Sequence, residues 1–381
     1  MTLPAHVAAA VRELPRPVCG YVYDAAVARA RARAVRAVLP AGAGLYYAVK
    51  ANGDPRMLAA LAGVVDGFEV ASGGELALAA GHRVLFGGPA KTDDELRAAL
   101  SADALLHVES VLELRRLAAL APDPAAVRLA LRVNRPGPVL PGSHAMTGTA
   151  TPFGIAEDAL PEAVRTARAL GLRPHGFHLH AVSNNLDAPA HAAFVTDALH
   201  WSERAAARLG IDLRYVNVGG GLGVDHTGQR AFDLDAFGAG LPDDPRLVLE
   251  PGRYLATPAG WYAAEVLDLK HTHGRWFAVL RGGTHHFRLP AAWGYSHPFT
   301  VLPVPEWPYD FARPQLRACT VDAVGELCTP RDVLARDHPV DRVRVGDVLV
   351  LANTGGYGWD ISHHDFLRHP HPAVRWLDTD A

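Results

Sequence analysis

The chain has 381 residues, 49% of them hydrophobic, which is enough to bury a sizeable core in two or three domains. Its 37 basic and 40 acidic residues give a formal net charge of −3 with no long basic run, so nucleic acid and membrane surfaces are not expected partners. Three scattered cysteines and the lack of a signal peptide or a membrane-spanning stretch predict a cytoplasmic protein that acts on a small molecule.

Short β-type runs alternate with alanine-rich helical stretches through the first 260 residues. The runs lie at 45–50, 67–72, 82–88, 104–110, 127–134, 173–180, 213–220 and 245–252. Eight strands that alternate with helices are typical of a closed parallel barrel rather than an open sheet. We therefore predict a (β/α)₈ TIM-like barrel over residues 22–260.

The pattern changes after residue 260. Further β-type runs at 263–270, 276–283, 299–305, 316–325 and 341–352 follow one another with turns and little helix between them. Such a series indicates a C-terminal antiparallel β domain. We place this domain at residues 261–381 and expect the N-terminal segment 1–21 to join it.

Chemically informative residues stand at the ends of several predicted barrel strands. Lys50 ends the first strand, His180 ends the sixth with Ser183 just beyond it, Gly219, Gly220 and Gly221 end the seventh, and Glu250 and Arg253 end the eighth. Catalytic groups in such barrels project from the carboxyl ends of the strands, and phosphate often binds after the last two. These residues are therefore expected to share one site.

Lys50 requires an explanation because it follows the apolar, aromatic run 45–49. An ammonium group in a barrel mouth is costly unless it is neutralised or covalently engaged, and desolvation favours the neutral, nucleophilic amine. A Schiff base with an aldehyde cofactor would satisfy both conditions. The alternative is a lysine that extends from the rim into water.

The other strand ends suit a phosphorylated pyridine cofactor. The glycines 219–221 let backbone N–H groups approach an anion, although glycine clusters also form ordinary turns. Glu250 suits a pyridine nitrogen and Arg253 an anion, unless the two form a salt bridge with each other. His180 would stack on the cofactor, whereas His178 points to the same side one layer deeper and is read as structural.

These motifs together resemble the fold-type III pyridoxal phosphate-dependent amino acid decarboxylases, the group of the diaminopimelate, ornithine and arginine decarboxylases. The matching stretches are YAVKAN at 47–52, GFEVASGGEL at 67–76, HAVS at 180–183, GGG at 219–221, EPGR at 250–253, CTPRD at 328–332 and GGYG at 355–358. The resemblance covers nearly the whole chain. It implies an alanine racemase-like fold, pyridoxal 5′-phosphate as cofactor, and a homodimer with active sites at the interface.

The resemblance also implies roles for matched residues. Lys50 would bind the cofactor as a Schiff base, His180 would stack on its ring, and Glu250 would pair with its nitrogen. Glu69 and Glu75 match acidic positions that orient the stacking histidine and the cofactor lysine. The phosphate would be held by Ser183, Gly219, Gly220, Gly221, Arg253 and Tyr357.

Two further residues would reach across the dimer interface into the neighbouring barrel. The resemblance makes Cys328 the acid that protonates the carbanion after CO₂ leaves, and Asp332 a substrate-binding residue. A buried, inert cysteine is the alternative, but Cys328 lies among Thr, Pro, Arg and Asp rather than in an apolar run.

Departures from the family pattern narrow the substrate. Thr329 and Pro330 follow the cysteine, where diaminopimelate decarboxylases have a glutamate, so free diaminopimelate is disfavoured. The stretches HAVSNN at 180–185, RGGTHHFRLPAAWG at 281–294 and LCTPRDVLAR at 327–336 are similar to the siderophore-pathway branch that decarboxylates citryl-2,3-diaminopropionate. Arg132, His285 and Arg288 would then bind carboxylates of the citryl group, unless residues 281–297 form only a surface hairpin.

Several alternatives stay open at this point. A free basic amino acid such as ornithine, lysine or diaminopimelate could be the substrate. A racemase shares the barrel and the lysine but needs a base on the second face, and a non-catalytic regulator would lack Lys50 or Cys328. Paired histidines at 285–286 and 363–364 stand outside known metal-ligand spacings, so we predict no metal.

Overall fold

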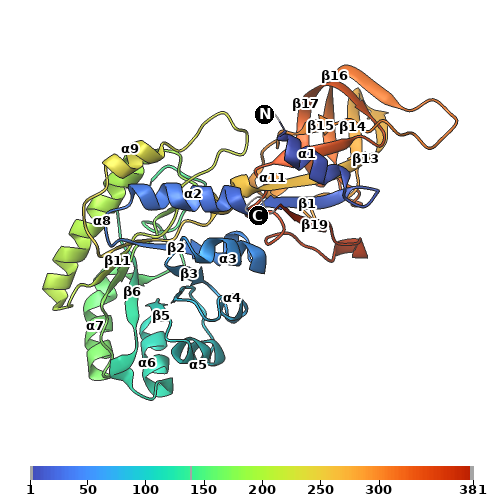
Figure 1. Ribbon diagram of the computed structural model, residues 1–381. Coiled ribbons are helices and arrows are strands. Elements are labelled where there is room, and N and C mark those ends of the chain that lie inside the picture. The colour runs from blue at the N-terminus through green and yellow to red at the C-terminus, as the bar shows by residue number, and fades with distance from the viewer. Residues whose placement is uncertain (1–2, 138–139, 378–381) are drawn as a thin grey trace. The chain divides into compact units, whose positions relative to one another are not determined.

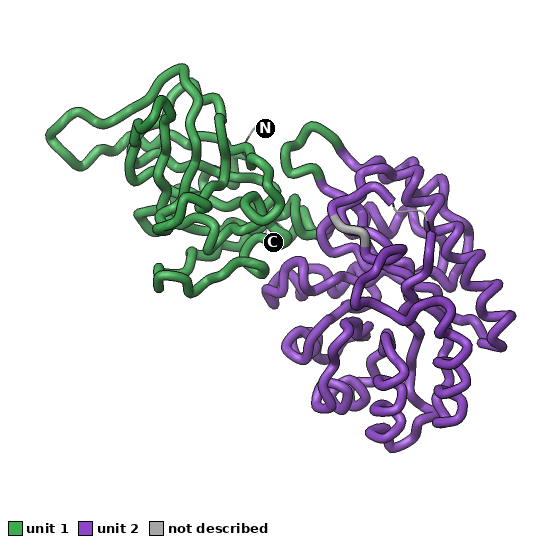
Figure 2. The backbone as a smooth tube through the Cα atoms, turned by 180° about the vertical axis from the view of Figure 1, so that it is seen from behind, with its two compact units in different colours: residues 1–28, 225–230, 256–381 green, residues 29–224, 231–255 purple. Residues whose placement is uncertain are grey.

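The computed structural model describes residues 3–137 and 140–377, and these fall into two compact units (Figure 2). The barrel unit comprises residues 29–224 and 231–255. The β unit comprises residues 1–28, 225–230 and 256–381, so it draws on both ends of the chain. None of the helices in the described ranges has both the length and the apolar character that crossing a bilayer requires.

Eight parallel strands form the barrel (Figure 1). They are β2 (Gly44–Ala48), β3 (Gly67–Val70), β4 (Val84–Phe86), β5 (Leu105–Val108), β6 (Leu129–Asn134), β9 (Gly176–His178), β11 (Tyr215–Asn217) and β12 (Leu247–Leu249). They follow the order β5, β4, β3, β2, β12, β11, β9, β6, and the pairing of β5 with β6 closes the sheet. The predicted (β/α)₈ barrel is confirmed: seven strands lie inside their predicted runs, and β2 begins one residue before its run.

Helices cover the outside of this barrel (Figure 1). They are α2 (Ala25–Val38), α3 (Pro55–Ala62), α4 (Gly73–Leu78), α5 (Asp93–Ser101), α6 (Val111–Leu120), α7 (Leu160–Ala169), α8 (Ala188–Leu209) and α9 (Leu234–Ala239). The short helix α10 (Arg253–Ala256) follows the last barrel strand. Many begin at a side chain that caps the first turn; Thr92 and Glu95 form a reciprocal capping box on α5. Three one-turn 3₁₀ helices lie at Val49–Ala51 (η1), Pro124–Ala126 (η2) and Glu157–Ala159 (η3).

Three two-residue strands accompany the barrel. They are β7 (His144–Ala145), β8 (Ile155–Ala156) and β10 (Val182–Ser183). β8 extends the barrel sheet beyond β6, and β10 pairs antiparallel with β7. Inside the barrel, buried side chains from six strands pack together: Tyr46, Leu85, Leu105, Ala130, Tyr215 and Val248.

The β unit is built on an eight-stranded sheet. Its strands are β1 (Cys19–Asp24), β13 (Gly260–Thr272), β14 (Arg275–Leu280), β15 (Thr300–Leu302), β16 (Gln315–Val324), β17 (Val333–Arg344), β18 (Val348–Ala352) and β19 (Ala373–Leu377). Most neighbours are antiparallel, but β14 with β16 and β1 with β19 are parallel, so the sheet is mixed. The chain between β14 and β16 makes a crossover through α11 (Leu289–Trp293) and β15, which lets β16 run in the same direction as β14.

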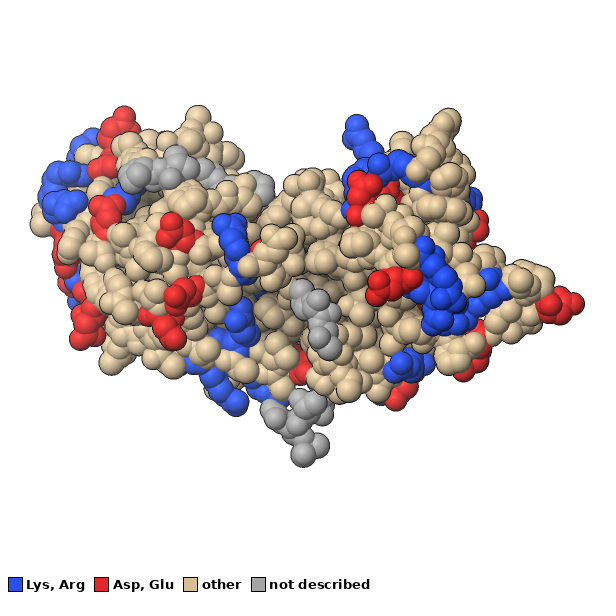
Figure 3. Space-filling view, turned by 90° about the horizontal axis from the view of Figure 1, so that it is seen from above, with Lys and Arg blue, Asp and Glu red and all other residues tan. Residues whose placement is uncertain are grey.

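The two faces of this sheet carry different cores, as β1 illustrates. Tyr21 and Tyr23 enter an aromatic-rich cluster, whereas Val22 between them joins a second cluster with residues of α1 (Ala5–Arg12). The 3₁₀ turns η4 (Thr257–Ala259) and η5 (Phe366–Arg368) complete the described elements. Acidic and basic side chains are interspersed on the face shown in Figure 3, in keeping with the small formal net charge.

Candidate active site

Lys50 lies at the carboxyl end of the first barrel strand. β2 ends at Ala48, and Lys50 occupies the following 3₁₀ turn rather than the strand itself. Its Nζ donates to Glu69 Oε2 on β3 at 2.6 Å. The Lys50 side chain is 43% exposed and that of Glu69 is 5% exposed, so a buried carboxylate neutralises an accessible amine. Burial raises the pKa of Glu69, while the charge of Lys50 opposes that shift.

Glu75 is a second carboxylate close to this pair. It belongs to the first turn of α4, and its Oε2 accepts the backbone N–H of Ala71 at 2.7 Å. Burial raises the pKa of Glu75, and the negative charge of Glu69 adds to the increase. Both acidic residues predicted to lie near the lysine are therefore within its electrostatic reach.

Glu250 is held by a buried hydrogen-bond network. Its Oε1 lies 3.0 Å from His178 Nε2, and its Oε2 accepts from Asn217 Nδ2 at 3.0 Å. Asn217 Nδ2 also donates to the hydroxyl of Tyr215 at 2.8 Å, and that hydroxyl lies 2.8 Å from His107 Nε2. The Glu250 carboxylate is thus fixed at two oxygens by neighbours that are themselves held.

The histidines of this network are neutral. Burial lowers the pKa of both His107 and His178 well below the usual value, and their rings stack at 4.0 Å. One ligand atom each from His107, His178 and Glu250 lie within 4.8 Å of one another, which is also a possible metal-ligand set. Because hydrogen bonds engage Nε2 of both histidines and both oxygens of Glu250, we assign the set to positioning Glu250.

The glycine loop after β11 packs directly against His180. Gly219 has φ +75°, and a Cβ there would lie 2.1 Å from His180 Nδ1. The N–H of Gly220 donates to the same nitrogen at 3.3 Å, so Nδ1 is the acceptor and the proton sits on Nε2. Burial lowers the pKa of His180 well below the usual value, and the charges of Lys50 and Arg132 lower it further.

Ser183 lies beside the same loop. It is the second residue of β10, and the chain just after it is tied to the glycines because Asn185 N–H donates to the Gly221 carbonyl at 2.8 Å. Gly221 has φ +88°, and a Cβ there would meet the Val182 carbonyl at 2.7 Å. The serine and the glycines predicted to bind phosphate therefore lie at one place.

Replacing Gly219 with alanine should disturb this arrangement. Alanine would force both the left-handed backbone and a clash with the His180 ring, so we expect a loss of about 1–3 kcal/mol in the free energy of unfolding. Weaker cofactor binding should accompany it. Thermal melting and cofactor titration measure both effects. The matched control is Gly63→Ala, where an added Cβ would meet no atom within 4 Å, and an equal loss in both variants would contradict the argument.

Two arginines complete the barrel site. Arg253 begins α10 directly after β12 and is buried. Arg132 on β6 is also buried; its NH1 donates to Glu109 Oε1 at 2.7 Å and its guanidinium stacks over Phe153 at 4.7 Å. The pairing with Glu109 engages the Arg132 charge inside the barrel, which argues against its predicted contact with a citryl carboxylate.

The other predicted residues lie in the β unit. Cys328 is exposed, at the start of the short turn that leads to β17. Asp332 is 2% exposed, and its carboxylate accepts the N–H groups of Thr284 at 2.6 Å and Leu327 at 2.9 Å. Asp332 therefore holds the loop that carries Cys328. Its role in substrate binding stays a prediction.

The predicted residues His285, Arg288 and Tyr357 of the β unit differ in burial. His285 is fully buried, with Nε2 3.8 Å from Glu326 Oε1, so a solvent-borne substrate does not reach it. Arg288, three residues on, is exposed. Tyr357 is half-buried against the aromatic core cluster and has φ +56°, a left-handed conformation that is uncommon for tyrosine.

Comparison with known proteins identifies the family of this chain. The family model described as "Pyridoxal-dependent decarboxylase, pyridoxal binding domain" matches residues 25–257, more than half of the chain. The chain belongs to the pyridoxal-dependent decarboxylase family. The predicted family and its cofactor, pyridoxal phosphate, are confirmed, and the protein is a carboxy-lyase.

Relatives of this decarboxylase differ in the substrates that their names give. It is 40% identical to "2-[(L-alanin-3-ylcarbamoyl)methyl]-2-hydroxybutanedioate decarboxylase" of Staphylococcus aureus, over 95% of this chain and 94% of the relative. It is 31% identical to a diaminopimelate decarboxylase of Methanothermobacter thermautotrophicus, over 86% of this chain and 78% of that one. The crystal structure of Helicobacter pylori diaminopimelate decarboxylase with L-lysine has a TM-score of 0.81 and 25% identity, over 95% and 92% of the two chains.

The barrel residues fit pyridoxal phosphate. The loop 219–221 has no room for side chains and brings backbone N–H groups to the strand ends, as a phosphate cradle requires. Glu250 offers a buried carboxylate to a ring nitrogen, and Lys50 offers an accessible amine. Three residues of the Glu250 network, His107, Tyr215 and Asn217, were not predicted as functional, although a polar residue within an apolar strand such as ALLHVES was a usable signal.

Proposed function

We propose that this decarboxylase is a cytoplasmic homodimer that removes the α-carboxylate of a citryl-2,3-diaminopropionate-type conjugate during the assembly of a carboxylate siderophore. The products would be CO₂ and the corresponding amine. The observation that carries this proposal is the 40% identity with the Staphylococcus aureus relative over 95% of the chain. The name of that relative's substrate describes an alanine whose β-carbon is joined through an amide to a hydroxylated dicarboxylate.

The barrel residues would hold and orient the cofactor. When bound, pyridoxal phosphate supplies an aldehyde that condenses with amines and a protonated ring that accepts the electron pair left by departing CO₂. Lys50, accessible and neutralised by Glu69, would provide the amine that binds the aldehyde and then yields it to the substrate. Glu250 would keep the ring nitrogen protonated, because His178 and Asn217 fix both of its oxygens.

The remaining barrel residues would position the ring and the phosphate. His180 is neutral and oriented by the Gly220 N–H, so it presents a flat face suited to stacking. Ser183 and the loop of Gly219, Gly220 and Gly221 would hold the phosphate, with Arg253 at the end of the eighth strand and Tyr357 completing the set. The N–H groups of Gly219 and Gly220 donate to Asn217 and His180, so these two glycines would contribute space for the phosphate rather than hydrogen bonds.

Cys328 would return a proton to the substrate carbon. Its thiol is exposed on a loop held by the buried Asp332, so a precise loop conformation presents it to solvent. In the proposed homodimer the Cys328 loop of one protomer serves the barrel of its partner. For the distal carboxylates of the substrate we favour Arg288, which is exposed, over Arg132 and His285, which are buried.

A decarboxylase of a free basic amino acid is the second candidate. The 31% identity with a diaminopimelate decarboxylase supports it. Thr329 and Pro330 after the cysteine oppose it, because glutamate is the family residue expected to read the distal amino acid centre of diaminopimelate.

A substrate panel tests the proposal. We expect CO₂ release from citryl-2,3-diaminopropionate with a kcat/KM at least roughly 100-fold above that for ornithine, lysine or diaminopimelate. The reason is that distal groups whose charge matches the site and those whose charge opposes it differ in binding free energy by several kcal/mol. Radiometric CO₂ capture measures the rates, and chiral analysis of recovered substrate excludes racemisation. Preference for a free basic amino acid would overturn the substrate assignment. Light scattering that gives a monomer at assay concentration would overturn the proposed dimer.

A further inference from the structure

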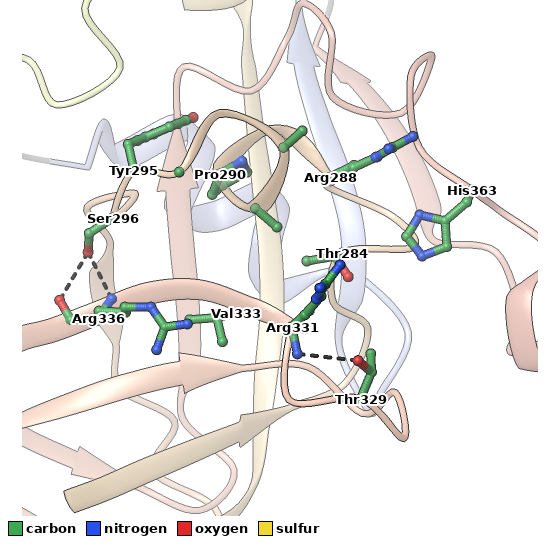
Figure 4. Close-up of a pocket in the computed structure, with 13 residues that line it drawn as sticks. Thr284, Arg288, Pro290, Tyr295, Ser296, Thr329, Arg331, Val333, Arg336 and His363 are labelled. Carbon is green, nitrogen blue, oxygen red and sulfur yellow. Dashed lines mark hydrogen bonds between the residues drawn. The ribbon is translucent and has the colours of Figure 1, made fainter.

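A pocket of about 770 Å³ lies within the β unit (Figure 4). Two segments distant in sequence line most of it, one around α11 and one that leads into β17, with His363 at the edge. The lining residues are Thr284, Arg288, Pro290, Ala291, Ala292, Gly294, Tyr295, Ser296, Thr329, Arg331, Val333, Arg336 and His363. This volume is in the range of small-molecule sites.

The lining is strongly basic. It includes Arg288, Arg331 and Arg336 and contains no aspartate or glutamate. No residue within 3–137 and 140–377 forms a hydrogen bond or an ion pair with the guanidinium groups of these three arginines. Several other arginines of the β unit are paired, as Arg275 is with Asp322 and Arg344 is with Asp347. The pocket therefore holds uncompensated positive charge, which favours an anionic ligand.

A hydroxyl group anchors the backbone of each of these arginines. The Thr329 hydroxyl accepts the N–H of Arg331 at 3.3 Å, and the Ser362 hydroxyl accepts that of Arg288 at 3.0 Å. The Ser296 hydroxyl makes two hydrogen bonds with the backbone of Arg336: it accepts the N–H at 2.8 Å and donates to the carbonyl at 3.0 Å. Figure 4 shows the contacts of Thr329 and Ser296. The main chain is thus fixed while the guanidinium groups stay available, an arrangement that suits recognition rather than structural support.

We infer that this pocket binds the carboxylates of the substrate's distal half, with Arg331 and Arg336 as the residues that determine specificity. The identity of that ligand rests on the proposed function. Arg331 lies between Cys328 and Asp332 in one loop, so a substrate protonated by the thiol would extend its tail along these arginines. The distal half of the relative's named substrate carries two free carboxylates and one hydroxyl, and planar guanidinium groups bind carboxylates through paired hydrogen bonds.

The positive charge of this pocket also explains why free basic amino acids should bind poorly. Lysine and ornithine carry a distal ammonium group, which would meet uncompensated arginines and no carboxylate among the lining residues. Diaminopimelate has a distal ammonium group beside its distal carboxylate, so only part of its distal end would be repelled. Such repulsion excludes competing substrates without any contact to them. The pocket therefore selects for amino acids conjugated to a polycarboxylate.

Three variants and one control test the inference. In Arg331→Gln and Arg336→Gln, KM for citryl-2,3-diaminopropionate should rise about tenfold each, and in the double variant about 100-fold, with kcat little changed. The matched control is Arg342→Gln, an exposed arginine of the same strand β17 that does not line the pocket. N3-acetyl-2,3-diaminopropionate keeps the amide and the α-carboxylate but lacks the distal carboxylates. Its kcat/KM should therefore be the same in all variants.

A binding measurement separates this inference from the proposed function. Calorimetry of the holoenzyme with tricarballylate, a tricarboxylate without an amino group, should show binding that the double variant weakens at least about tenfold and Arg342→Gln leaves unchanged. If the wild type decarboxylates the conjugate but the double variant keeps its KM, the pocket assignment is wrong and the function stands. If the conjugate is not a substrate, unaltered tricarballylate binding in the double variant likewise overturns the pocket, whereas weakened binding upholds an anion site.

Discussion

Turnover should disappear when Lys50 is replaced with alanine. The amine that binds the cofactor aldehyde is then missing, and kcat is expected to fall by roughly 10³-fold or more, as when other covalent nucleophiles are removed. The fold should persist, because the Lys50 side chain is 43% exposed and contributes little to the core. Because buried Glu69 loses its partner, the free energy of unfolding at neutral pH should also fall slightly.

Borohydride reduction locates the amine directly. The chain has three lysines, so mass mapping of the pyridoxyl label has three possible outcomes. Lys91 is buried and paired with Glu113 at 2.7 Å, and Lys270 is an exposed residue of β13 that serves as the matched control when changed to alanine. Label on Lys50 and full activity in Lys270→Ala are expected. Label elsewhere, or turnover in Lys50→Ala, would refute the assignment.

Replacing Cys328 with serine should slow catalysis and misdirect it. A serine hydroxyl is a much weaker acid than a thiol, so protonation of the substrate carbon should lose about 10²–10⁴-fold, the usual contribution of a positioned acid. CO₂ would still leave, because the barrel residues that support its departure are unchanged. Protonation at a cofactor carbon, followed by hydrolysis, would then give a carbonyl product in place of part of the amine, and the amino nitrogen would stay on the cofactor.

The measurement compares CO₂ with amine product. Wild type should release them in equal amounts, and Cys328→Ser should release more CO₂ than amine, with a lower rate. Cys319→Ser is the control, because Cys319 lies half-buried in β16 and has no proposed role. Unchanged rates and equal yields in Cys328→Ser would remove the cysteine from the mechanism and leave the source of the proton elsewhere.

Local pattern was sufficient for the barrel. Each of the eight predicted runs matches one barrel strand, because strands buried on both faces must be nearly continuous in apolar residues and bounded by turn formers. Lys50, His180 and Glu250 were recognisable for the same reason: parallel strands bring their carboxyl ends to one side, so a polar residue just after each strand predicts a shared site. In the β unit local pattern was weaker. The run 341–352 spans the end of β17, a turn and β18, and β1 and β19 were not predicted.

By itself, the sequence determined the eight-stranded barrel and the residues that follow the strands, since these depend on periodicity and spacing along the chain. Its motifs also carried the resemblance to the decarboxylase family. Only the tertiary structure decided how side chains from distant segments compensate one another. It showed that Asn217, His107 and Tyr215 support Glu250, that Glu109 engages Arg132, and that Asp332 and His285 are buried. It also brought Arg288 into one pocket with Arg331 and Arg336. The physical reason is that burial and ion pairing arise from packing between elements, which no local pattern encodes.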